Sequence, residues 1–175
     1  MKERWWYYSI SMSNPLVERS FRHMGWANSQ MLNIVSALPD DAINFSAWNP
    51  DWTVGKIAHH IVVAEARLIS RITEQQFSDE LEAPTTAQGI KELISICRER
   101  DAQLLKLSNT PEEIRTFKRF GKDSTFLTST ILAQATNHAT EHRAQISDIL
   151  AANEMDVLNL DEIDLWAFET WEKSH

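Results

Sequence analysis

The chain has 175 residues, a length that fits one domain, and its 43% hydrophobic and 24% charged residues are typical of a globular protein. Its net charge of −8, with 17 basic residues dispersed among 25 acidic ones, argues against nucleic acid and anionic membrane surfaces as partners, because both need clustered Lys and Arg. The chain has one cysteine and no apolar run long enough for a signal peptide or a membrane span, so we expect a cytoplasmic protein.

The first twelve residues precede any helical pattern. They include a charged and aromatic opening and end at Met12, which is itself a candidate start of translation. We therefore expect residues 1–12 to be an N-terminal extension that need not be ordered, and residues 13–170 to form a single domain.

Long stretches with apolar residues at 3.6-residue spacing lie between only four glycines and five prolines, which predicts helices. The first helix should begin at Asn14, an N-cap that Pro15 follows at the first helical position, and should end before Pro39. Residues 39–51 are typical of a loop, and the second helix should run from about residue 53 to residue 77.

The third helix should span residues 86–107, and the fourth should span residues 127–152, which have the strongest pattern. The segment between them, residues 109–126, is ambiguous. Pro111 could start a short helical turn, while residues 115–120 and 124–126 flank a hairpin-like excursion at Gly121.

Four long helices with short connections predict an all-α fold, and specifically a four-helix bundle. After the fourth helix, the tail contains Leu165, Trp166 and Phe168, which make it apolar enough to pack on the helices. We therefore expect a bundle with a short docked C-terminal segment.

The histidines are the strongest candidates for chemistry. His138 and His142 stand four residues apart in the fourth helix, so both rings project from one face, which also carries apolar residues. In the second helix His60 borders the apolar stripe, whereas its neighbour His59 faces solvent. The three inward rings could converge on one metal, or they could be core histidines that hydrogen-bond to neighbouring polar groups.

Three neutral imidazoles suit zinc, nickel, copper or iron(II). Three protein ligands also leave a coordination position free, as in catalytic zinc sites. We expect Zn or Ni as the cofactor, with Fe or Mn as alternatives. Of the other histidines, His23 lies at the edge of the apolar face of the first helix, and the C-terminal His175 should fray.

Several stretches resemble the motifs of one family. Residues 26–28 (Trp-Ala-Asn) are similar to its W-x-N element, and His60 with Glu65 is similar to its H-x4-E element. Residues 137–145 (Asn-His-Ala-Thr-Glu-His-Arg-Ala-Gln) are similar to its N-H-x3-H-R-G-Q element, and residues 164–168 to its D-L-x-x-Y ending. The sequence thus resembles the DinB/YfiT-like family of metal-binding four-helix-bundle proteins, which is named for DNA-damage-inducible genes.

The resemblance implies that His60, His138 and His142 are the metal ligands, and that the protein is a homodimer with a role in stress response. Two positions depart from the family pattern. Ala144 replaces the more usual Gly, a mild change within a helix. Glu141 occupies a position where His is often expected, which leaves room for different surroundings of the metal.

Three functions follow from these features. The resemblance implies an enzyme that acts on small molecules, either a transferase of a low-molecular-weight thiol, with Arg143 or a loop residue binding the acidic groups of the thiol, or a hydrolase. A metallopeptidase is an alternative, because residues 138–142 match H-x-x-E-H with Glu141 as general base. The third is a non-catalytic metal-binding stress or interaction module. The sequence assigns no catalytic residue.

Around the predicted ligands, Glu65, Asn28 and Gln145 could hydrogen-bond to the imidazoles or could be ordinary polar groups at the boundary of the core. We expect Cys97 to be a small core residue rather than a reactive thiol. Trp26, Trp48 and Trp52 lie near predicted helix ends, where we expect core and loop anchoring, with lining a pocket as the alternative.

Overall fold

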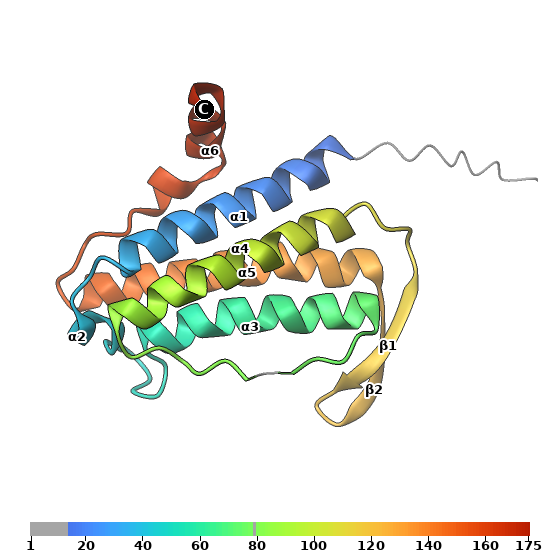
Figure 1. Ribbon diagram of the computed structural model, residues 1–175, viewed down its shortest axis with the longest axis horizontal. Helices are drawn as coiled ribbons and strands as arrows, with labels where there is room; N and C mark the ends of the chain where they lie inside the picture. Colours follow the sequence, from blue (N-terminus) through green and yellow to red (C-terminus); the bar gives the residue numbers. More distant parts are fainter. Residues whose placement is uncertain (1–13, 79) are drawn as a thin grey trace, which may run out of the picture.

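The computed structural model describes residues 14–78 and 80–175 as a mostly helical chain with one small sheet (Figure 1). The predicted extension at residues 1–12 lies outside the described residues. In chain order the elements are α1 (Pro15–Val35), α2 (Asp40–Ile43), α3 (Val54–Thr73), α4 (Ala87–Leu107), β1 (Ile114–Arg119), β2 (Lys122–Leu127), α5 (Thr128–Ala152), the 3-10 helix η1 (Leu160–Ile163) and α6 (Leu165–Ser174).

Side-chain caps explain where three of the long helices begin. Oδ1 of Asn14 accepts a hydrogen bond from the backbone N–H of Leu16, with Pro15 at the first turn of α1. Thr53 and Thr86 cap α3 and α4 in the same way, each through its hydroxyl oxygen. The predicted starts of these helices are therefore confirmed to within a residue.

Two predicted boundaries are wrong. The helix expected to reach residue 77 ends at Thr73, because Glu74 adopts a left-handed conformation (φ 59°) that terminates α3. The stretch at residues 39–51, predicted as a loop, contains the short helix α2, which follows Pro39. Pro39 has an extended backbone that does not continue α1, but its ring suits the position before a new helical turn.

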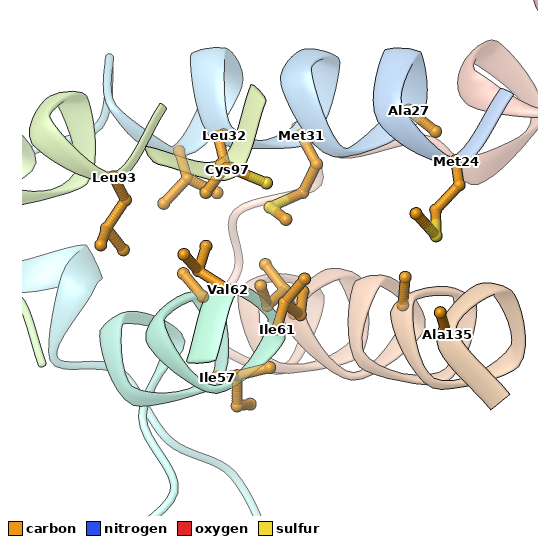
Figure 2. Close-up of a cluster of buried hydrophobic side chains, with 14 of the residues drawn as sticks. Met24, Ala27, Met31, Leu32, Ile57, Ile61, Val62, Leu93, Cys97 and Ala135 are labelled. Carbon is orange, nitrogen blue, oxygen red and sulfur yellow. The ribbon is translucent and has the colours of Figure 1, made fainter. Parts of the chain in front are cut away.

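The four long helices pack around one apolar core. Helix α1 contacts α4 and α5, and α3 contacts the same two helices. In Figure 1 these helices run alongside one another. Figure 2 shows that each of them contributes to a cluster of buried apolar side chains, which includes Met24, Met31, Ile61, Leu93 and Ala135. The apolar stripes that the sequence predicts thus face a common interior.

The expectation of an all-α fold is wrong for residues 114–127, which form an antiparallel hairpin of β1 and β2. Arg119 pairs with Lys122, and the two residues between them, Phe120 and Gly121, both have positive φ, as a two-residue hairpin loop requires. The hairpin contacts α3 and α5. Because an isolated hairpin is marginally stable in water, this packing explains why the hairpin-like excursion expected around Gly121 forms here.

The C-terminal segment contacts α1 through a buried aromatic side chain. Phe168 is 2% exposed, and its ring lies 5.5 Å from that of Trp26. Glu172 forms ion pairs with Arg19 and Arg22 of α1. His175, predicted to fray, stacks on the indole of Trp171. None of the helices in the described ranges combines the length and apolar character that a bilayer-spanning segment requires.

Candidate metal centre

Three imidazole rings converge between α3 and α5. His60 comes from α3, and His138 and His142 come from successive turns of α5. Nε2 of His138 lies 3.0 Å from Nε2 of His60 and 3.1 Å from Nε2 of His142. One ring nitrogen of each histidine thus lies within 4.8 Å of the others, a spacing compatible with one shared divalent metal.

The rings are partly withdrawn from water. His142 is buried, and His60 and His138 are half-buried. Burial lowers the pKa of His60 and of His138 to about 4, and the charges of neighbouring rings lower it in the same direction. Both rings are therefore neutral at physiological pH, and the neutral ring is the form that binds a metal.

The donor set fits a metal better than it fits hydrogen bonding within the protein. A neutral imidazole Nε2 has one in-plane site, which holds either a proton or a lone pair. Nε2 of His138 meets two other Nε2 atoms at hydrogen-bonding distance, so it can satisfy only one of them. A cation that accepts one lone pair from each ring satisfies all three.

Trp52 and Gln145 determine which nitrogen of His142 carries the proton. The indole Nε1–H of Trp52 can only donate, and it donates to Oε1 of Gln145 over 3.1 Å. The same oxygen lies 2.7 Å from Nδ1 of His142, so Nδ1 must be the protonated nitrogen that donates to it. Nε2 of His142 then holds the lone pair that faces the other two rings. Of the two roles that the sequence left open for Gln145, the structure shows the hydrogen bond to an imidazole.

The indole of Trp52 also packs edge-on against two of the rings. Its centroid lies 5.1 Å from that of His60 and 5.9 Å from that of His142. The sequence interpretation favoured core or loop anchoring for Trp52, with pocket lining as the alternative, and did not place its ring beside the histidines. Trp52 precedes the first helical residue, Val54, so a helical wheel does not place it. The signal that was available is its spacing of eight residues before His60, inside a stretch that resembles a family motif.

Glu65 and Asn28 do not contact the imidazoles but belong to a separate buried network. The side-chain amide of Asn28 donates to a carboxylate oxygen of Glu65 (3.0 Å) and to one of Asp101 (3.1 Å). The thiol of Cys97 donates to Asp101 (3.5 Å), and the guanidinium of Arg143 donates to Oδ1 of Asn28 (2.7 Å). The network thus joins α1, α3, α4 and α5 across the interior.

The charges of this network balance within the fold. Burial and the adjacent Asp101 raise the pKa of Glu65 well above its usual range, and burial raises the pKa of Asp101 to about 6. Burial lowers the pKa of Arg143 only to about 10, so it stays charged. With the proton on Glu65, one guanidinium balances one carboxylate. Burial also raises the pKa of the Cys97 thiol, which is buried as predicted and not a thiolate.

The expectation that Arg143 binds the acidic groups of a thiol does not agree with this position. Arg143 is 4% exposed, and it donates to Asn28 and to the hydroxyl of Thr140. The guanidinium is instead held in the interior by these two acceptors. The sequence alone does not show this, because Arg143 and Asn28 are 115 residues apart.

Two other histidines have partners outside the triad. His59 is half-buried, and its Nε2 lies 2.6 Å from the carbonyl oxygen of Leu81, so the prediction of a solvent-facing ring is wrong. The segment that follows α3 contacts the face of this helix that the helical wheel assigns to solvent. His23 lies 2.9 Å from the carbonyl oxygen of Ile163 and is not part of the triad. Glu141 is exposed.

Comparisons with known proteins agree with this fold. The model of the DinB family matches residues 12–153. A solved structure, a DinB-like protein from Bacillus cereus ATCC 10987, is similar with a TM-score of 0.57 and 22% sequence identity, over 86% of this chain and 99% of that one. At that identity the similarity concerns the fold. No curated protein matches the sequence. Because the family model covers most of the chain, the protein belongs to the DinB family.

Proposed function

We propose that the protein holds one divalent metal through His60, His138 and His142, and that it is an enzyme acting on small molecules. The observation that carries this proposal is the convergence of three Nε2 atoms that cannot all be satisfied by hydrogen bonds to one another. Membership of the DinB family and the three-histidine cluster are both compatible with a metal site.

The chain's own residues have separate tasks in this site. Gln145 holds His142 in the tautomer that presents Nε2, and the Trp52 indole shields His60 and His142 from water on one side. His60 and His138 line an adjacent cleft, through which a small molecule would reach the site. A metal bound here would act as a Lewis acid with a coordination position left for the substrate. We propose Zn or Ni, with Fe or Mn as alternatives.

The reaction that we propose is transfer of a low-molecular-weight thiol or hydrolysis of a small molecule. The metallopeptidase alternative has less support, because its general base would be Glu141, whose side chain is exposed to solvent. A homodimer and a cytoplasmic location remain predictions.

Metal content tests the first part of this proposal. Protein purified without an affinity tag should contain about one divalent metal per chain, because each chain supplies one set of three converging imidazoles. Elemental analysis measures this directly. Metal-free protein that also fails to bind zinc and nickel at micromolar concentration would contradict the site. A loaded protein should then be screened for thiol transfer and for hydrolysis. Loss of every activity with metal retained would favour a non-catalytic module.

Replacing Gln145 should weaken metal binding without removing a ligand. Gln145→Leu deprives His142 of the acceptor that fixes its tautomer and orientation, and loss of such a partner typically lowers metal affinity about 10–100-fold. Gln145→Glu keeps an acceptor in the same place, so it should bind metal more tightly than the leucine variant. Competition with a zinc chelator measures both. Equal affinities of wild type and Gln145→Leu would show that this hydrogen bond does not orient the ligand.

A further inference from the structure

A cleft of about 320 Å³ lies between α3, α5 and the hairpin, and His60 and His138 form part of its wall. That volume is at the lower end of the roughly 300–1,000 Å³ of small-molecule sites. The hairpin closes one side of the cleft. An ion pair connects it to the end of α3, in which the guanidinium of Arg115 donates to the carboxylate of Glu74 over 2.9 Å. The cleft is thus built by tertiary packing next to the triad.

The cleft gathers positive charge in a protein whose net charge is −8. Arg67, Arg71 and Arg119 line it, and no Asp or Glu is among the described residues of its wall. Arg67 and Arg71 come from successive turns of α3, and Arg119 ends β1. Like charges at such spacing repel one another, and a cleft with low-dielectric walls concentrates their field. The field favours an anion in the cleft.

Arg71 is the cation best placed to meet a ligand. Its side chain is half-buried, and within the described ranges neither Arg71 nor Arg119 has a carboxylate partner for its guanidinium. Burial lowers the pKa of Arg71, and the charges of Arg67 and Arg119 lower it in the same direction. The charge of a bound anion would compensate for both the burial of this guanidinium and its repulsion by the two neighbouring arginines. A cation in the last turn of α3 interacts favourably with the helix dipole, which would account for Arg71 alone. It does not account for three arginines around one cleft.

An aromatic surface lies beside these cations. The guanidinium carbon of Arg71 lies 4.4 Å from the ring centroid of Phe117, and Phe117 stacks on Phe126 with centroids 5.4 Å apart. Both rings come from the hairpin and line the cleft. A flat apolar group would find a ring to pack against, next to a guanidinium that is a strong donor to planar anions.

We propose that this cleft binds a small molecule in which an anionic group is joined to a flat apolar body. Arg71 and Arg119 bind the anionic group, the aromatic pair of Phe117 and Phe126 packs against the body, and the other end of the molecule faces His60 and His138. This inference rests on the proposed function, because the reaction would take place at the end of the ligand that faces the two histidines.

The test is a calorimetric titration of the full-length protein with benzoate, with phenyl phosphate in parallel, and with benzamide as a neutral analogue of the same shape. Each titration is done with chelator present and again with one equivalent of zinc. Benzoate or phenyl phosphate should bind at least about tenfold more tightly than benzamide, since a charge-assisted hydrogen bond to Arg71 is stronger than a neutral one. The anion that binds more tightly shows whether the cleft prefers a carboxylate or a phosphate. Failure of both anions to bind the folded protein at millimolar concentration would overturn the proposal.

Two matched variants assign the binding to the cleft. Arg71→Gln should weaken binding of the anion at least about tenfold, whereas Arg98→Gln should leave it within about twofold, although both remove one positive charge. Arg98 lies on α4 and bonds to Ser29, away from the cleft. Circular dichroism confirms that both variants are folded. Equal affinities of the two variants would refute the assignment. Zinc retained without anion binding would refute only this inference, and anion binding by a protein that retains no zinc would refute only the proposed metal site.

Discussion

Replacing His60 with alanine should abolish tight metal binding, whereas the same substitution at the adjacent His59 should leave it intact. Nε2 of His60 lies 3.0 Å from Nε2 of His138 inside the triad, but Nε2 of His59 lies against the carbonyl oxygen of Leu81. Loss of an outer partner of a ligand typically lowers metal affinity about 10–100-fold, so loss of the ligand itself should exceed about 100-fold. Chelator competition on both variants measures the difference.

The fold should survive this loss of metal. The four long helices share an apolar core that does not depend on the triad, and each fully buried large side chain contributes about 1.5–3 kcal/mol. A site with three protein ligands is also typical of catalytic metals, whereas structural zinc sites usually have four. Helical content of the His60→Ala variant should therefore match that of the wild type by circular dichroism. Loss of helix would make the metal a structural element and would remove the support for an enzyme.

Replacing Arg143 with methionine should lower the free energy of unfolding by about 3–5 kcal/mol, the usual cost of removing one partner from a buried charged network. Arg143 is the cation that balances the Glu65–Asp101 pair, and it donates to Asn28 in the interior. Methionine fills a similar volume, so the loss reports charge and hydrogen bonding rather than a cavity. The thermal midpoint should fall by roughly 6–20 °C.

The control for Arg143 is Arg98→Met, which removes an exposed arginine from α4 and should change stability by less than about 0.5 kcal/mol. Glu65→Gln offers a second comparison. Because burial and Asp101 raise the pKa of Glu65, its carboxyl favours the protonated form, and the amide of glutamine has nearly the shape of that form. It should cost far less than Arg143→Met. Equal losses in all three variants would show that the network does not stabilise the fold through its charge balance.

The sequence by itself determined the helices and the candidate triad, because both depend on local geometry. Caps such as Asn14 and Thr86 set helix starts through bonds to residues two or three positions away. The spacing of His138 and His142 places both rings on one face of α5 through the helical repeat alone. The wheel also oriented His60 toward the core. The family resemblance named the same fold and the same three residues.

The tertiary structure decided everything that depends on residues far apart in the chain. The wheel could not show that Leu81 covers His59, or that Arg143 meets Asn28 across 115 residues. The sequence left residues 109–126 ambiguous, because a hairpin there gains its stability from packing on α3 and α5. The cleft with its three arginines exists only because that hairpin folds beside the triad. Local periodicity fixes the direction of a side chain, but only packing decides what it meets.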